Sequence, residues 1–231
     1  MAVSSGYEDR YHWLRQHGRS LGIVWTELGH EVFFGGRDPE QARQAAGFTH
    51  GRARYGTNDE AAIFGDVLLY SLRGVDPSEA LPQIDSLDNK IVIDLNNLPI
   101  PPDFAYDPIT ISHAEKLQQQ IPRSRVVKAY NTFPQEIIEL FPDRIRQFKV
   151  ATFVAADDQQ ARETVIKLSQ ELGLDPIDCG PLNRARLLEG LADFIRFLMI
   201  GGARPDANFS IVDVPDVENP RLGGRQPTKL G

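Results

Sequence analysis

Short apolar runs alternate along the chain with segments of helical periodicity. The runs are rich in Val, Ile, Leu and Phe and show little polar alternation, which is typical of strands buried on both faces of a sheet. They predict strands at Glu31–Gly35, Asp66–Leu72, Ile91–Leu95, Arg125–Ala129 and Lys149–Ala155. Strands that alternate with helices indicate a parallel sheet with crossover helices. The pattern therefore predicts a doubly wound α/β fold.

The segments between the predicted strands carry helix start and stop signals. Asp38 precedes Pro39 and can cap a helix that stops at Gly47, and Ser112 with Glu115 fits a capping box. Asp158 can cap a further helix that stops at Gly173. A last helix, at about residues 184–200, and a loose tail at Asn219–Gly231 complete a small C-terminal helical part.

Composition and charge narrow the class of protein. The chain has 231 residues and a formal net charge of −7, which argues against nucleic acid as a partner, because too few cations are available to neutralise phosphates. One cysteine excludes a disulfide framework and a multi-thiolate zinc site. No apolar run approaches the length of a membrane span, and the first ten residues lack a secretory apolar region. We expect a cytoplasmic protein that does not bind a membrane.

Several strings in a fixed order resemble one family, the NADPH-dependent coenzyme F-420 reductases, whose dinucleotide domain also occurs in metalloreductases. The strings are Gly29–Val32, Gly36–Glu40, Ile93–Asn97, Val126–Thr132, Cys179–Leu182, Ala185–Arg186 and Glu189. The resemblance covers about residues 18–200. It implies a Rossmann-like dinucleotide-binding domain at residues 18–180, followed by the helical part and tail at 181–231. It also implies NADP(H) as cofactor and a homodimer formed through the C-terminal region.

The N-terminal segment, residues 1–17, departs from the family pattern. The family opens with a strand that runs into GxGxxG, whose glycines let the pyrophosphate approach the backbone and a helix N-terminus. Counting back from Gly29 places the third glycine at Gly18, and Trp13 and Arg15 then stand at the first two glycine positions. Residues 1–17 therefore stand at the position of the first strand but lack its sequence pattern. The phosphate loop that should follow this strand is disrupted.

The genetic code offers an explanation for this departure. Residues 8–18 can be back-translated and read one base later as Arg-Ile-Gly-Ile-Ile-Gly-Ser-Gly-Asn-Met-Gly, a strand followed by a complete GxGxxG. Most codons are free in this reading, but the Trp13 codon followed by any leucine codon must give the first motif glycine. One hypothesis is a single-base deletion or sequencing error near codon 18. The other is a divergent N-terminal arm.

Three groups of residues are candidates for binding the dinucleotide. Gly18, Arg19 and Ser20 start the predicted first helix and could bind phosphate, although a plain helix start explains them as well. Gly36 and Arg37 follow a strand with no acid at its end, which favours the 2′-phosphate of NADP over the ribose of NAD. A surface arginine beside a turn is the alternative for Arg37.

The nicotinamide side is predicted at the carboxyl ends of later strands. Ser71, Leu72 and Asn97 follow strands at the edge where ligands of open α/β sheets bind, although Asn97 could simply form a turn. The family resemblance implies that Ala129 and Asn131 face the nicotinamide and the pocket of the second substrate.

No catalytic acid or base is predicted. Cys179 has no paired histidine and is expected to be inert, and the five histidines show no metal spacing. Lys128 is expected to bury the aliphatic part of its side chain, with its amine paired at the sheet edge, and not to act as a catalytic base. Arg186 is expected to form an ion pair with Glu189. Hydride transfer between two bound rings mainly needs their contact and the exclusion of water.

The sequence therefore predicts an NADP-dependent oxidoreductase that transfers a hydride between NADPH and a second cofactor or small acceptor, such as coenzyme F-420 or a flavin. The alternative is a Rossmann-fold binding or scaffold protein that lacks a working phosphate loop.

Overall fold

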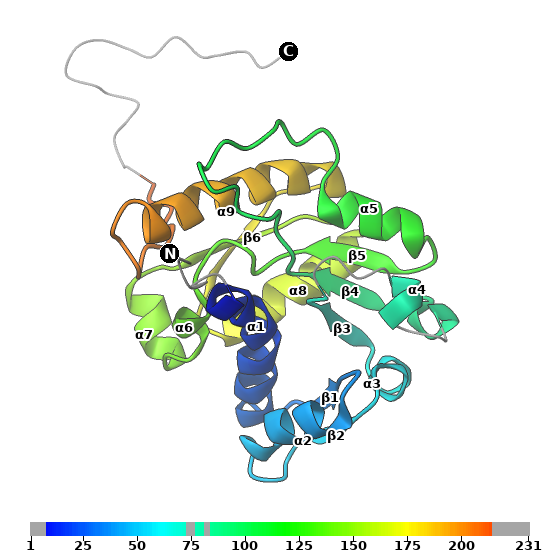
Figure 1. The fold of residues 1–231 in the computed structure, drawn as a ribbon. Helices are drawn as coiled ribbons and strands as arrows, with labels where there is room; N and C mark the ends of the chain where they lie inside the picture. Colours follow the sequence, from blue (N-terminus) through cyan, green and yellow to red (C-terminus); the bar gives the residue numbers. More distant parts are fainter. Residues whose placement is uncertain (1–7, 73–76, 81–83, 214–231) are drawn as a thin grey trace, which may run out of the picture.

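A computed structural model describes residues 8–72, 77–80 and 84–213 (Figure 1). Its helices are α1 (Glu8–Glu27), α2 (Pro39–Gly47), α3 (Asn58–Phe64), α4 (Pro77–Ala80), α5 (His113–Gln120), α6 (Gln135–Ile138), α7 (Pro142–Gln147), α8 (Gln159–Glu171) and α9 (Ala185–Ile200), with 3-10 turns η1 (Ile84–Leu87) and η2 (Leu182–Arg184). Its strands are β1 (Phe33–Gly35), β2 (Arg54–Gly56), β3 (Val67–Tyr70), β4 (Ile91–Asp94), β5 (Arg125–Lys128), β6 (Ala151–Val154) and β7 (Asp175–Asp178).

All strand pairs within the sheets are parallel, and the ladders form three groups. β1 pairs with β2, β4 lies between β3 and β5, and β6 pairs with β7. A single antiparallel bridge between Lys128 and Ala155 connects β5 to β6. The architecture is a Rossmann-like, mostly parallel α/β fold with a small C-terminal helical part, as the sequence pattern predicts.

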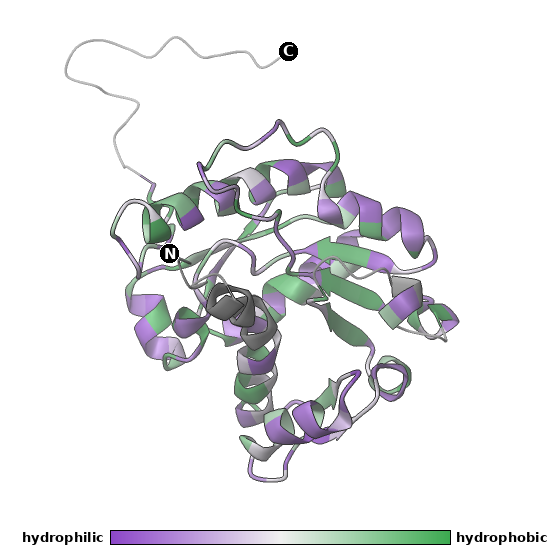
Figure 2. Cartoon of the chain, viewed as in Figure 1, coloured by the Kyte–Doolittle hydropathy of each residue, from purple (hydrophilic) through white to green (hydrophobic). Residues whose placement is uncertain are grey.

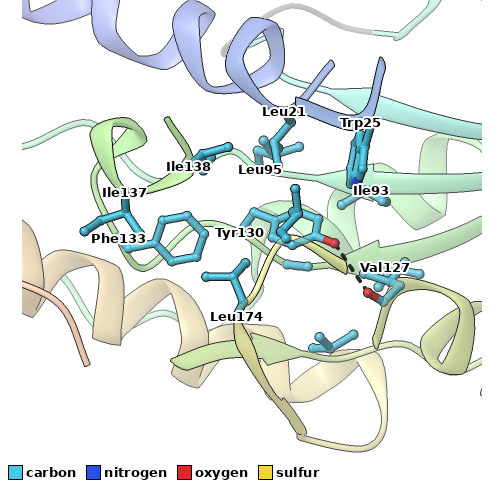
Figure 3. Close-up of a cluster of buried hydrophobic side chains, with 14 of the residues drawn as sticks. Leu21, Trp25, Ile93, Leu95, Val127, Tyr130, Phe133, Ile137, Ile138 and Leu174 are labelled. Atoms are coloured by element: carbon cyan, nitrogen blue, oxygen red, sulfur yellow. Dashed lines mark hydrogen bonds between the residues drawn. The ribbon is translucent and has the colours of Figure 1, made fainter. Parts of the chain in front are cut away.

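Helices cover both faces of the central strands. Ile93 and Val127 point to one face, where Leu21 and Trp25 of α1 pack with Tyr130 (Figure 3). Their sequence neighbours Val92 and Val126 point to the other face and pack against α5. Burial on both sides explains why the middle positions of these strands are apolar, as the green of β4 and β5 in Figure 2 shows.

The helix boundaries follow the predicted local signals. The Asp38 carboxylate accepts a hydrogen bond from the Glu40 amide at 3.0 Å at the start of α2. Ser112 and Glu115 form the complete capping box of α5, and Asp158 caps α8. The sequence pattern missed β2 and β7, because both are short and each lacks a continuous apolar run. The predicted tail, Asn219–Gly231, lies outside the described residues.

The N-terminal segment does not contribute a strand in the part that the structure describes. Residues 8–17 are helical and form the first half of α1. The charged residues among positions 8–12 make this sequence a poor candidate for a strand at the centre of a sheet. Within the described ranges, β1 pairs with β2 alone and β3 with β4 alone, so the sheet is interrupted between β1 and β3. None of the described helices is long and apolar enough to cross a bilayer.

Candidate cofactor-binding site

A cavity of about 1480 Å³ opens where β1, β3 and α1 come together. Six of the predicted cofactor-binding residues line it: Gly18, Arg19, Gly36, Arg37, Ser71 and Leu72. The last four follow the carboxyl ends of β1 and β3, which is the edge where open α/β sheets bind ligands. The fold therefore gathers these candidates around one cavity, from segments far apart in the sequence.

The end of β1 leaves Arg37 available. The next residue, Asp38, is engaged as the cap of α2, and Gly36 donates to the Gly56 carbonyl at 3.1 Å. Arg37 is exposed, and within the described part of the chain its guanidinium forms no ion pair. Since β1 ends in Gly35 with no acid to compete for this guanidinium, the rim offers a cation where a 2′-phosphate would need one.

The prediction that Gly18, Arg19 and Ser20 start the first helix is wrong. These residues lie in the middle of α1 (Glu8–Glu27), so their backbone amides belong to a continuous helix and not to a free N-terminus. A Cβ added to Gly18 would lie 3.3 Å from the Ser71 hydroxyl, so α1 passes close to the end of β3. The Arg19 guanidinium lies over the Phe48 ring at 5.2 Å from its centroid. Ser20 is directed elsewhere: it is buried, and its hydroxyl donates to a Glu139 carboxylate oxygen at 2.7 Å.

Asn97, Ala129 and Asn131 form a second, buried group that does not line this cavity. The Asn131 amide nitrogen donates to the Asn97 side-chain oxygen at 2.9 Å and to the Leu188 carbonyl of α9 at 3.0 Å. Asn97 in turn donates to the Asn131 carbonyl at 2.9 Å. Ala129 is fully buried at the end of β5. The two asparagines thus fasten the ends of β4 and β5 to α9, and Asn97 is more than a turn former.

A buried ion network lies beside these asparagines. Lys128 has no exposed surface, and its Nζ lies 2.9 Å from an Asp94 oxygen and 3.0 Å from a Glu189 oxygen. Glu189 also accepts from the His113 amide at 2.9 Å. The network joins β4, β5, α5 and α9, and its full pairing offsets the cost of burying three charges.

The predicted pairing of Arg186 with Glu189 is wrong. Arg186 pairs with Glu115 of α5 at 2.6 Å, whereas Glu189 turns inward to Lys128. The sequence signal that could have found this is Lys128 itself, because a lysine in a strand buried on both faces needs a carboxylate partner.

The titratable groups with shifted pKa values do not line the cavity. Hydrogen bonds from Arg186 lower the pKa of Glu115 to about 2, and burial lowers the pKa of His113. Burial raises the pKa of Cys179, which keeps that thiol protonated and inert. Among the described residues, no three His, Cys, Asp or Glu side chains are grouped to hold a metal ion. The arrangement suits binding and orientation of a ligand.

The comparisons with known proteins agree with this geometry. Residues 16–98 match the family described as NADP oxidoreductase, coenzyme F420-dependent. The chain is 27% identical to human Metalloreductase STEAP2 over 75% of its own length and 33% of the relative's. It is 25% identical to the F420-dependent NADP reductase of Methanothermobacter thermautotrophicus, over 87% of the chain and 92% of that protein.

A solved structure from Arthrobacter sp. FB24, assigned as an F420-dependent NADP reductase, superposes with a TM-score of 0.71 at 25% identity. It covers 85% of this chain and 95% of that one. The chain spans about one third of the length of the curated metalloreductases it matches. The family match, the curated F420-dependent reductases and the structural neighbour converge: residues 16–98 are similar to the family described as NADP oxidoreductase, coenzyme F420-dependent, and the chain resembles NADP-dependent oxidoreductases of that kind over most of its length.

Proposed function

We propose that this protein binds NADPH across the carboxyl ends of β1 and β3 and promotes hydride transfer to a second bound ring. The observation that carries the proposal is the exposed guanidinium of Arg37, which has no ion-pair partner among the described residues and lies on the rim of a cavity that Gly18, Gly36 and Ser71 also line. NADPH, when bound, would supply the hydride. Arg37 would contact its 2′-phosphate, and Gly18, Arg19 and Gly36 would leave room for the pyrophosphate.

The hydride acceptor is proposed to be coenzyme F-420 or a flavin. Several relatives carry F420 dependence in their names. In this chain the Asn96 amide donates to the Tyr70 carbonyl at 3.0 Å, so the end of β4 is tied to the end of β3 at the edge of the cavity. The Asn97 and Asn131 group begins there, and its contact with α9 would close the acceptor side against water.

We further propose a homodimer that forms through α9. One side of this helix is buried, but Leu187, Phe194, Phe197 and Ile200 are all more than 40% exposed. A row of large exposed apolar side chains on one helix marks an interaction surface in many proteins. A second copy of the chain would bury this row in a closed two-fold contact.

The interrupted sheet favours one alternative, a binding or scaffold protein with an impaired phosphate loop. Residues 8–17 are helical where the family has a strand and two glycines. Side-chain-bearing residues, Trp13 and Arg15, take those glycine positions in the sequence alignment, and a Cβ there would occupy space that the pyrophosphate needs.

A fluorescence titration of the 231-residue chain with NADPH and with NADH tests the two candidates. Dissociation constants in the micromolar range for NADPH and at least about tenfold weaker binding of NADH would support the oxidoreductase. A folded chain that binds neither nucleotide would favour the scaffold protein. Hydride transfer to coenzyme F-420 and to flavin, followed by absorbance, would then identify the acceptor of an NADPH-binding chain.

A further inference from the structure

We infer that the loop between β4 and α5 is a lid on the acceptor side of the proposed site, and that Arg196 holds it closed on α9. We call residues 98–111 the strap. Its role as a gate for the second ring rests on the proposed function. Its closed position and the residue that holds it follow from the contacts of the strap itself.

The strap is a long segment with little structure of its own. It contains neither helix nor strand, and four of its residues are prolines, which have no amide hydrogen to donate. Among the described residues, one backbone–backbone hydrogen bond joins two of its members, from the Phe104 amide to the Pro101 carbonyl at 3.0 Å. Loops of this length in a compact domain are usually functional, and segments with few internal hydrogen bonds open most easily.

Three contacts between described residues place the strap on α9. The Leu98 carbonyl accepts a hydrogen bond from the Arg196 guanidinium at 2.7 Å. The same guanidinium lies over the Tyr106 ring, 6.0 Å from its centroid. The Phe104 ring meets the Phe197 ring edge-on, with the ring centroids 5.5 Å apart. The loop between β4 and α5 accordingly passes over α9 in Figure 1.

Arg196 is itself fixed on α9. Its side chain is 14% exposed and forms an ion pair with Asp193, one turn back on the same helix. Its Nε donates to the Ala192 carbonyl at 3.1 Å. These bonds hold the guanidinium in the position from which it reaches both Leu98 and Tyr106. Loss of this one side chain would therefore release the strap at two points.

The strap lies on the face of α9 that also binds the asparagine pair. Leu188, Ala192 and Arg196 are spaced by four residues and form a row along one face of the helix. The Leu188 carbonyl accepts from Asn131, and Arg196 holds the strap about 12 Å further along the axis. The strap also starts directly after Asn97, the partner of Asn131. A lifted strap would therefore uncover the side on which the acceptor is proposed to bind.

The closed strap stores backbone strain at Phe104. The φ of this residue is +57°, in the left-handed region that bulky side chains rarely adopt. Strain of this kind persists only where surrounding contacts maintain it, and here the contact is with Phe197. The strap is thus closed by its contacts with α9 and opposed by its own backbone, which is the balance that a lid requires.

Limited proteolysis with chymotrypsin measures the opening of the strap. Phe104 and Tyr106 are partly buried against α9, so the bonds after them become accessible when the strap lifts. We expect Arg196→Met to speed cleavage at these bonds by at least about tenfold, because cleavage follows the population of the open form. Arg43→Met is the matched control, because Arg43 forms the same i,i+3 ion pair with Glu40 on α2.

Two outcomes of this experiment would overturn the inference. The first is a cleavage rate in Arg196→Met within about twofold of the rate in the unmodified chain. The second is an equal increase at the bond after Phe148, which is 51% exposed at the end of α7, because the variant would then be unfolding as a whole.

Two further variants test the strain at Phe104. Phe197→Ala and Phe104→Asn both remove the contact between the rings, but only Phe104→Asn relieves the strain, because asparagine tolerates the left-handed conformation. We expect cleavage after Tyr106 to be at least about threefold faster in Phe197→Ala than in Phe104→Asn. Equal rates would show that Phe104 does not oppose closure and would overturn that part of the inference.

Addition of FMN or of coenzyme F-420, each together with NADPH, tests the role of the strap as a gate. We expect a bound ring to slow cleavage after Phe104 in the unmodified chain by at least about threefold, because a lid that excludes water must close over the ring. No protection by either compound would overturn the gate and leave only the lid.

The NADPH titration separates this inference from the proposed function. Faster cleavage of Arg196→Met in a chain that binds no NADPH would leave the lid standing and remove the proposed function. NADPH binding together with unchanged cleavage of Arg196→Met would do the reverse.

Discussion

At the scale of single residues, Arg37 is the side chain that we propose selects NADPH over NADH. We expect Arg37→Ser to weaken NADPH binding by about 10- to 100-fold, the worth of one or two charge-assisted hydrogen bonds, and to leave NADH binding unchanged. The fluorescence titration described above measures the dissociation constants for NADPH and for NADH. Arg52→Ser is the control, because Arg52 is exposed but does not line the cavity. Equal losses for both nucleotides would contradict the assignment.

Arg186 and Glu115 give a prediction for pH dependence. The pKa of Glu115 is lowered from 4.5 to about 2, chiefly by hydrogen bonds from Arg186. A lowered pKa stabilises the folded state above pH 4.5, and this contribution disappears as the pH falls from about 4.5 to about 2. Because the Arg186 side chain is 43% exposed and solvent weakens the ion pair, we expect Arg186→Gln to lower the free energy of unfolding only slightly at pH 7.

Urea unfolding of both proteins from pH 7 to pH 2 measures this difference. The gap in the free energy of unfolding should stay constant down to about pH 5 and close near pH 2. A gap that is the same at pH 7 and pH 2 would show that Arg186 acts through packing alone.

At the scale of elements, the turn after α8 depends on a glycine for two separate reasons. Gly173 has a φ of +84°, and an added Cβ would lie 2.2 Å from the Pro142 carbonyl oxygen at the start of α7. Gly180 has a similar φ of +79° but open space around it. We expect Gly180→Ala to cost about 1 kcal/mol through backbone strain, and Gly173→Ala to cost at least about 3 kcal/mol through strain and the backbone clash.

Chemical denaturation of the two variants measures these costs side by side. Equal losses of stability would show that α7 moves away freely and that only the backbone conformation matters.

Most elements were predictable from the sequence, because their causes are local. The caps Asp38, Ser112 and Asp158 bind amides within three residues of themselves, so the helix starts follow from the sequence alone. β2 and β7 were not predictable in the same way. Each is held by pairing with one distant strand, and neither has an apolar run of its own.

At the scale of the whole molecule, the proposed dimer depends on the exposed apolar side of α9. We expect Phe194→Glu to raise the dissociation constant of the dimer by at least about tenfold, because a carboxylate would be buried in the contact. Analytical ultracentrifugation over a range of protein concentrations measures this. Lys167→Glu, an exposed change on α8, is the control. A chain that is monomeric throughout this range before any substitution would remove the proposal.

The sequence alone predicts the fold class, five of the strands, the helix caps and six of the residues that line the cavity. Those features depend on apolar periodicity and on contacts between residues close in sequence, and both can be identified in a single sequence. It also indicated that Tyr7–His12 is a poor candidate for a buried strand, because its charges would face apolar neighbours there.

Which distant groups meet became visible in the folded chain and not in its sequence. The tertiary structure directed Ser20 to Glu139, paired Arg186 with Glu115, and enclosed Lys128 between Asp94 and Glu189. It also left β1 and β3 with open edges on one cavity. Such pairings depend on long-range geometry. The sequence offers each charged side chain several oppositely charged or polar candidates, and packing brings one of them within reach.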